Sequence, residues 1–317
     1  MINKIIKKIK SVIYIFNRSI NHPLNKNNKI NSIFKILKFN IGKRLVNKND
    51  IIVPWVNDSK FIISKEDAQI RWNIYCGLVE YIEMLFLMHV LRQNNTFIDV
   101  GSNVGIYSIL ASKVIGAKSI SFEPHPNTFK KMIKNFSINS INHLVNPINK
   151  GVGSKVEKLN FTNFHDTRNI LNKIQNNNNL KKNEIIQVEI TTLDKEINLD
   201  DEYFIKTDTE GYEYQVLQGG LNTIKNKKLI GLIIETNSMS EEFGYSREII
   251  HKNLESNGLI SVDYDPFKRK ITKKTNFLVL DDYASPSSIY VRDIDKIQNL
   301  VSNAKPIKIQ TAYDINV

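Results

Sequence analysis

Cysteine is nearly absent from this sequence of 317 residues, and its scarcity excludes two kinds of architecture. Cys76 has no second cysteine with which to form an intrachain disulfide, and no cysteine cluster can hold zinc. A chain without disulfides is typical of a reducing compartment. We therefore expect a cytoplasmic protein.

Long apolar runs are also missing. No window reaches the roughly 18 uninterrupted apolar residues that a membrane-spanning helix needs. The apolar run at residues 12–16 is too short for the core of a secretion signal, and no small-residue cleavage site follows it. The sequence therefore predicts neither a membrane span nor secretion.

Acidic residues are fewer than basic ones, and the formal net charge is +12. Such an excess is typical of proteins that bind nucleic acid or an anionic membrane surface. The chain is also rich in Lys, Asn and Ile together, which an AT-rich coding sequence favours, and it lacks clusters of Arg interleaved with aromatic residues. We therefore attribute most of the basicity to base composition, treat the lysines as spread over the whole chain, and do not expect a nucleic acid partner.

The chain is long enough, and with 41% hydrophobic residues apolar enough, for one main domain with additions. Residues 1–20 predict a basic amphipathic helix, which we expect to pack on its own domain. Peripheral contact of that helix with the inner face of a membrane is the alternative. Residues 21–50 predict a linker with one short helix around 32–39. Residues 51–94 predict an accessory hairpin and then a helix over 70–92.

The main domain is expected over residues 95–283, and it opens with the stretch TFIDVGSNVG at residues 96–105. An apolar run, two glycines four apart and a helical pattern predict a strand, a tight turn and a helix. Such a turn lets the backbone approach a cofactor. The carboxylate of Glu123 follows about 20 residues later at the tip of the next predicted strand, where folds of this kind bind ribose hydroxyls.

Acidic residues also follow two later predicted strands. Asp208 and Glu210 come directly after the apolar strand 203–207, and Glu235 with Asn237 follows the strand 229–234. Carboxylates at such strand ends point into the ligand crevice of an open parallel sheet. The segments 259–264 and 276–280 predict a closing antiparallel pair, and residues 284–317 predict a tail with one weak helix at 294–301.

A dense polar cluster precedes the Asn-rich segment 172–183 and is a candidate to face the substrate. It contains His165, Asp166 and Asn169. His165 is a candidate base, although a lone His in a polar loop is more often simply solvated. His125 and His143 are weaker candidates.

Several ordered motifs together resemble the FkbM family of class I S-adenosylmethionine-dependent methyltransferases over roughly residues 77–281. They are GLVE at 77–80, DVGSNVG at 99–105, FEP at 122–124, TLD at 192–194, IKTDTEGYE at 205–213 and VLQGG at 216–220. Ser102 stands where the family usually has Ala, and Thr207 and Thr209 replace common aliphatic residues. None of these differences removes a charged group.

The resemblance implies an α/β fold with a Rossmann-like, doubly wound, mostly parallel seven-stranded sheet and an antiparallel terminal hairpin. It also implies methyl transfer to hydroxyl oxygens of sugars, polyketides or other small metabolites, for example in bacterial polysaccharide biosynthesis. The residues then expected to bind the cofactor are Asp99, Gly101, Ser102, Asn103, Gly105, Glu123 and Pro124. A dinucleotide enzyme would prefer the pattern GxGxxG, but Asn103 occupies its middle position, which fits S-adenosylmethionine better.

Asp208, Glu210 and His165 are the candidate catalytic residues, and Asp166, Asn169, Glu235 and Asn237 are the candidate substrate-binding residues. Three alternatives stay open at this point. Asp99 could anchor the methionine amino group or fix the glycine turn. Glu210 and Glu213 could charge the first turn of the next helix. Asp208 and Glu235 could hold Mg²⁺.

Three classes of function remain. The leading one is an O-methyltransferase that acts on a hydroxyl of a small molecule, a sugar or a surface glycan. The second is an RNA methyltransferase, which the charge suggests. The third is a non-catalytic membrane-associated binding protein that uses the N-terminal helix.

Overall fold

The structure is a computed structural model that describes residues 2–27, 29–45, 50–64, 70–163, 185–236, 239–275, 287–310 and 314–316. The chain divides into two compact units. The smaller unit contains residues 1–81 and 306–317, and the larger one contains residues 82–305.

The smaller unit begins with two helices, α1 (Ile2–Asn21) and α2 (Lys29–Leu45), joined by a 3₁₀ turn at Pro23–Asn25. The strands β1 (Asp50–Pro54) and β2 (Lys60–Ser64) form the predicted antiparallel hairpin, and β14 (Lys308–Gln310) pairs with β15 (Asp314–Asn316). The helix predicted over 1–20 is confirmed. The short helix predicted at 32–39 is instead α2, because a single Gly42 costs only about 1 kcal/mol and does not end a helix.

The helix predicted over 70–92 is two helices, α3 (Arg71–Cys76) and α4 (Tyr81–Val90). Gly77 adopts a φ of +86°, and its N–H bonds to the carbonyl of Asn73. The side chain of Asn73 then accepts from the N–H of Val79. Gly77 ends α3, and the Asn73 side chain fixes the short turn that leads to α4.

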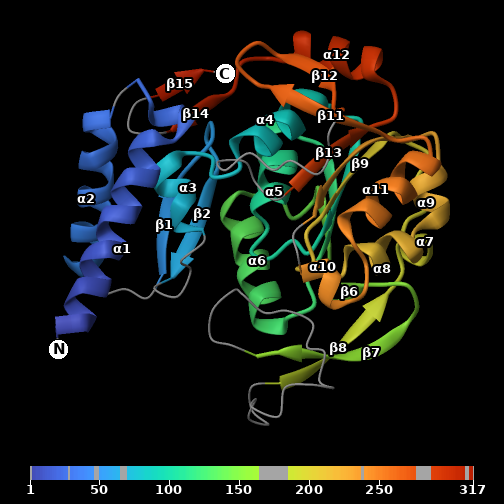
Figure 1. Cartoon of the computed structure of the whole chain (residues 1–317), viewed down its shortest axis with the longest axis horizontal. Coiled ribbons are helices and arrows are strands. Elements are labelled where there is room, and N and C mark those ends of the chain that lie inside the picture. The colour runs from blue at the N-terminus through green and yellow to red at the C-terminus, as the bar shows by residue number, and fades with distance from the viewer. Residues whose placement is uncertain are drawn as a thin grey trace. The chain divides into compact units, whose positions relative to one another are not determined.

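The larger unit is built on an eight-stranded sheet in the order β12-β11-β13-β10-β9-β3-β4-β5 (Figure 1). The bounds are β3 (Thr96–Val100), β4 (Lys118–Phe122), β5 (Val145–Ile148), β9 (Tyr203–Thr207), β10 (Leu229–Glu235), β11 (Ile260–Asp265), β12 (Lys270–Lys273) and β13 (Ser287–Val291). Five neighbours, β5, β4, β3, β9 and β10, are parallel, whereas β13 is antiparallel to both β10 and β11. Seven of these strands form the predicted mostly parallel sheet, and β12 extends it beyond β11.

The segment predicted as a C-terminal tail contributes an interior strand of this sheet. β13 lies between β10 and β11, and four of its five residues are buried. Its sequence, SSIYV, is short and follows a polar stretch, so periodicity alone gives a weak signal. The strand predicted at 276–280 lies outside the described residues. Helix α12 (Ile294–Ser302) matches the helix predicted there.

Helices cover both faces of the sheet (Figure 1). One face carries α4, α5 (Ile106–Ile109) and α6 (Pro126–Ile138), where α5 continues as a π-helix over Leu110–Ile115 and ends at Gly116. The other carries α7 (Leu193–Glu196), α8 (Glu213–Gln218), α9 (Leu221–Lys225) and α11 (Arg247–Ser256). The main apolar core joins β3, β9 and β10 to this second group of helices.

A second, three-stranded sheet has the order β6-β8-β7. It consists of β6 (Gly151–Val152), β7 (Glu157–Thr162) and β8 (Ile185–Thr191). The segment that joins β7 to β8 contains His165, Asp166 and Asn169. These three candidates lie outside the described residues, as does Asn237.

Candidate functional site

The glycine turn after β3 lies directly against the backbone that follows β9. Gly101 has a φ of +79°, and a Cβ built on it would lie 1.9 Å from the carbonyl oxygen of Asp208. The N–H of Asp208 in turn donates to the carbonyl of Val100 at 3.0 Å. Only glycine fits this contact, so the turn and the acidic strand tip form one continuous surface.

The same turn is joined to the tip of β4 through Glu123. The backbone N–H of Asn103 donates to Oε2 of Glu123 at 3.0 Å, and the N–H of His125 donates to Oε1 at 2.8 Å. Asn103 itself has a φ of +53°, a conformation that Asn tolerates better than most residues. The middle position that departs from the dinucleotide pattern therefore has a backbone role.

Glu123 is only 7% exposed, which removes the interpretation of a solvated loop acid. Burial raises its pKa to about 8, against the opposing effect of the two N–H bonds. When this group is ionised, each carboxylate oxygen accepts one backbone hydrogen bond and has a second lone pair, so each can still accept a ribose hydroxyl. The acceptor oxygens at this strand tip therefore fit the ribose hydroxyls of an adenosyl cofactor.

Asp99 belongs to a buried polar network on the α5 face of the sheet. Its Oδ2 accepts from Oγ of Ser108 at 2.6 Å, and Ser108 also bonds to Oγ of Ser121 at 2.7 Å. Burial raises the pKa of Asp99, while the positive charge of Lys206, its register partner on β9, acts in the opposite direction. The side chain of Ser102 bonds to the Asp99 carbonyl, which fixes the turn.

Lys206 is the functional residue that the sequence analysis missed. It is 3% exposed, its Nζ lies 2.8 Å from Oδ2 of Asp208, and Nζ also lies 4.6 Å from the ring centre of Tyr107. The signal was present, because a charge inside the apolar strand YFIKT must have a partner when a parallel strand is buried on both faces. Asp99 on one side and Asp208 two residues further provide that partner.

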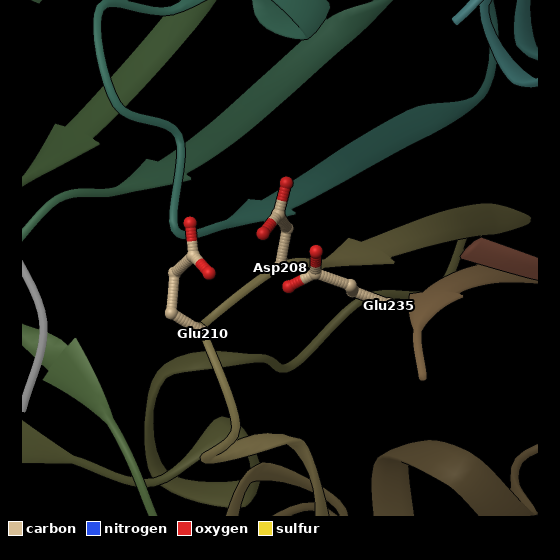
Figure 2. A group of neighbouring side chains, drawn as sticks. All are labelled: Asp208, Glu210 and Glu235. Carbon is tan, nitrogen blue, oxygen red and sulfur yellow. The ribbon is translucent and has the colours of Figure 1, made fainter. Parts of the chain in front are cut away.

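Three carboxylates gather at the tips of β9 and β10. One oxygen each of Asp208, Glu210 and Glu235 lies within 4.8 Å of the others, and Figure 2 shows the three groups converging on one space. Glu210 has a φ of +55°, an unusual conformation for a non-glycine residue, and such strain is often found at functional sites. The sequence prediction that these acids share one crevice is consistent with this geometry.

The charges of this cluster are unequal. Burial and then the negative charge of Asp208 raise the pKa of Glu235 to about 10, so Glu235 is protonated at neutral pH. Burial also acts to raise the pKa of Asp208, but the ion pair with Lys206 and a hydrogen bond with Glu235 outweigh it and lower that pKa. An ionised acceptor and a neutral donor therefore lie side by side, and Oε2 of Glu235 is buried without a hydrogen-bond partner.

Two other acidic motif residues have structural roles. Glu213 accepts hydrogen bonds from the N–H and Oγ1 of Thr209 and from the N–H of Gly211, so it fixes the loop before α8. Asp194 accepts from the N–H groups of Asn222 and Thr223, so it caps α9. The TLD motif is thereby explained by helix capping.

Helix α10 (Met239–Glu242) and the residues after it lie beside the acidic loop. A Cβ on Gly211 would meet the backbone of Met239 at 2.8 Å. The rings of Tyr214 and Tyr245 stack at 3.9 Å, and the rings of Tyr212 and Phe243 meet edge to face at 5.4 Å. This aromatic wall was not predicted from the sequence, because its two halves, residues 212–214 and 243–245, are far apart in the chain.

The structure thus brings together the turn 101–105, Glu123 and the tip at Asp208. Pro124 lies beside them, with its carbonyl bonded to the side chain of Asn149. Gly105, with a φ of +82°, begins α5, where a Cβ would meet the ring of Phe136. His125 caps α6 through Nδ1 and is 2% exposed, and it therefore serves as a helix cap.

Residues 99–259 match the family model described as the methyltransferase FkbM domain. No curated protein matches the sequence.

Several solved structures share a loose likeness with the chain. The M. jannaschii tRNA m1G37 methyltransferase is 12% identical with a TM-score of 0.40, over 77% of this chain and 56% of that one. M. jannaschii TYW2 in complex with AdoMet is 14% identical with a TM-score of 0.38, over 77% and 84%. An rRNA methylase from Streptococcus thermophilus is 9% identical with a TM-score of 0.34, over 66% and 92%.

Proposed function

The chain belongs to the FkbM methyltransferase family, and from this premise we propose that it transfers a methyl group from S-adenosylmethionine to a hydroxyl oxygen of a small molecule, a sugar or a surface glycan. The observation that carries the proposal is the backbone contact between Gly101 and Asp208. This contact supports the proposal because it makes the glycine turn and the acidic end of β9 direct neighbours. We propose a reducing compartment, the cytoplasm, for this reaction.

S-adenosylmethionine, when bound, supplies an electrophilic methyl group on a sulfonium centre. The turn 101–105 approaches such a ligand with its backbone, and Glu123 accepts hydrogen bonds from the ribose hydroxyls. The negative charge of Asp208 favours a cation at this strand end, while Lys206 pairs with Asp208 and faces Asp99. These residues bind and orient, and orientation is worth at most about 7–11 kcal/mol in such a displacement.

The acceptor hydroxyl is positioned by the carboxylates that converge in Figure 2. Ionised Asp208 accepts the hydroxyl proton, and Oε2 of Glu235, which has no hydrogen-bond partner, accepts a hydrogen bond from another hydroxyl of the acceptor. Glu210, the third member of the cluster, contributes to the placement of the acceptor. The aromatic wall formed by Tyr214 and Tyr245 offers a flat apolar surface of the kind that packs against sugar rings.

The test of Asp208 is methyl transfer from labelled S-adenosylmethionine to a panel of sugar nucleotides, glycans and lipid extracts. A base contributes roughly 10²- to 10⁴-fold to such steps, so Asp208→Asn should lower kcat by about 100-fold and change KM little. Asp263→Asn is the matched control, because this carboxylate on β11 has a side chain that is 60% exposed. Unchanged turnover in Asp208→Asn would remove Asp208 as the base.

The cofactor site is tested separately by calorimetry with S-adenosylmethionine. Glu123→Gln keeps one acceptor oxygen and replaces the other with an amide NH₂ group, which cannot accept a hydrogen bond, so affinity should fall about 10-fold, as expected when a hydrogen bond is lost at a buried site. Glu189→Gln, an exposed acid on β8, should bind like the native chain. Failure of the native chain to bind at millimolar ligand would overturn the methyltransferase proposal as a whole.

We also propose that the acidic cluster binds Mg²⁺. Asp208, Glu210 and Glu235 offer hard oxygen ligands close enough to hold one ion, and the buried Oε2 of Glu235 has no hydrogen-bond partner. Calorimetry with Mg²⁺ alone should show binding that Glu235→Gln abolishes and Glu189→Gln preserves. The absence of a binding heat at millimolar Mg²⁺ would overturn this part of the proposal.

A further inference from the structure

The net positive charge of the molecule comes from one segment. Residues 1–49 contain 12 Lys and Arg and no Asp or Glu, whereas the other 268 residues contain 32 of each sign. The first 49 residues therefore carry the whole formal net charge of +12. The lysines are spread over the whole chain, as expected, but the acids are not, and base composition alone does not explain a segment without acids.

The same segment exposes large apolar side chains. Among the described residues, eight of the twelve exposed large hydrophobic side chains lie between residues 6 and 41. On α2 they are Ile30, Phe34, Leu37 and Ile41, which are 68%, 64%, 42% and 55% exposed. Their spacing of four, three and four residues places them on one stripe of the helix.

The opposite side of α2 is already occupied. Ser32 and Ile36 are buried, the ring of Phe39 contacts the ring of Tyr75, and Asn40 bonds to the Tyr75 hydroxyl. The helix therefore cannot rotate to bury the stripe without breaking these contacts. Lys38 lies next to the stripe, four residues after Phe34, and its side chain is exposed.

Helix α1 runs beside α2 and repeats the pattern (Figure 1). Ile6 and Ile13, one heptad apart, are 45% and 61% exposed, and exposed Lys10 lies between them on the same side. Towards its C-terminal end the helix is held by Arg18, whose guanidinium lies 4.7 Å from the ring centre of Trp72, and by buried Ser19. These contacts fix the C-terminal end of α1, and in that position Ile6 and Ile13 remain exposed.

We propose that α1 and α2 dock on an anionic phospholipid bilayer, with the two apolar stripes inserted at the level of the acyl chains and the flanking lysines on the lipid phosphates. An interfacial helix buries its apolar face about 5–10 Å into the headgroup boundary, and anionic lipid attracts the basic residues beside it. No helix in the described part of the chain is long and apolar enough to cross a bilayer, so the contact is peripheral.

A bilayer fits this segment better than RNA does. RNA binding relies on arginine, aromatic stacking and hydrogen bonds to bases, whereas aliphatic side chains add nothing to it. Residues 1–49 contain only two arginines, Arg18 and Arg44, and Arg18 is engaged with Trp72. A second copy of the chain fits less well, since a net charge of +12 in the segment would face the same charge.

The experiment is flotation of the full chain with vesicles of phosphatidylcholine alone or with about 30% phosphatidylglycerol. The native chain should bind the anionic vesicles at least about 10-fold more tightly than the neutral ones. Ile30→Ser with Phe34→Ser should reduce this binding about 10-fold or more, because both apolar side chains are lost. Lys10→Gln with Lys38→Gln should reduce it about 10-fold or more, at roughly five-fold for each lysine.

The matched controls lie in the larger unit. Phe267 is 55% exposed and the Lys268 side chain 78% exposed, so Phe267→Ser and Lys268→Gln remove the same groups elsewhere. Both should bind vesicles like the native chain. All variants should keep the native affinity for S-adenosylmethionine or, if the native chain binds none, the native unfolding midpoint, which shows that they are folded.

Three outcomes would overturn the proposal. Equal binding to neutral and anionic vesicles would remove the role of the lysines. Salt-sensitive binding of a single-stranded RNA oligonucleotide with no vesicle binding would favour an RNA surface. A dimer in sedimentation that Ile30→Ser with Phe34→Ser converts to a monomer would identify the stripes as a contact between copies of this chain.

Discussion

At the scale of single residues, the site depends on one buried cation among several acids. Lys206 pairs with Asp208 and faces Asp99, and both acids lie at strand tips that the sequence had already singled out. The acids were predictable because each follows an apolar run. Lys206 was overlooked because its role comes from a neighbouring strand, and one strand read alone does not show its neighbour.

Replacing Lys206 by Met should destabilise the protein by roughly 3 kcal/mol, the lower end of the cost of breaking a buried ion pair. The lower end applies because the Asp208 side chain remains 30% exposed. Urea unfolding measures the effect. Lys252→Met is the control, since its pair with Glu248 on α11 is exposed to solvent and should contribute little. Equal losses in the two variants would contradict the buried network.

Glu123 makes stability depend on pH. Its pKa is raised to about 8 in the folded protein, whereas the unfolded chain releases this proton near its usual value of about 4.5. Between these values the folded state holds more protons than the unfolded one, so the free energy of unfolding falls as pH rises. The slope is at most about 1.4 kcal/mol per pH unit.

We therefore expect Glu123→Gln to flatten the decline of the unfolding midpoint between about pH 5 and pH 8. Urea unfolding at a series of pH values measures the slope for both chains. The exposed Glu189→Gln should leave the native slope unchanged. A native and a Glu123→Gln chain with the same slope would show that Glu123 ionises in the folded state like a solvated acid.

At the scale of elements, the glycine turn between β3 and α5 is limited by the carbonyl of Asp208. Gly101→Ala adds both an unfavourable positive φ and a collision with that backbone, so it should cost clearly more than about 1 kcal/mol and abolish cofactor binding. Gly244→Ala adds the same kind of φ penalty with nothing within 4 Å of its Cβ. Thermal unfolding and calorimetry of both variants separate the two effects. Gly244→Ala reports the cost of the positive φ alone, and any further loss in Gly101→Ala comes from the collision with Asp208.

The elements that the sequence predicted correctly are those whose signals are local. The strand and turn at 96–105, the helix at 1–20 and the hairpin at 51–64 have clear periodicity or turn residues. The full length of α2 and the interior place of β13 were not predictable in the same way. Apolar residues of α2 remain outside any core, and β13 gains its stability from β10 and β11, which are distant in the sequence.

At the scale of the whole molecule, the segregation of charge separates two proposed activities. Residues 50–317 have equal numbers of acidic and basic residues, so their cofactor site should respond weakly to salt. Between about 0.1 M and 1 M salt the screening length falls from about 10 Å to about 3 Å. Vesicle binding should then weaken at least about 10-fold, while the Kd for S-adenosylmethionine changes less than about two-fold. Parallel changes in the two affinities would contradict this separation.

The contact between Gly101 and Asp208 has a consequence for how the two ligands affect each other. The turn proposed to approach the methyl donor and the carboxylate proposed to receive the acceptor are joined by a backbone hydrogen bond and a close backbone contact. A shift of the turn on donor binding would be transmitted to the position of Asp208. Such energetic coupling is reciprocal, so a donor that tightens acceptor binding by some factor must itself be bound more tightly, by the same factor, when the acceptor is present.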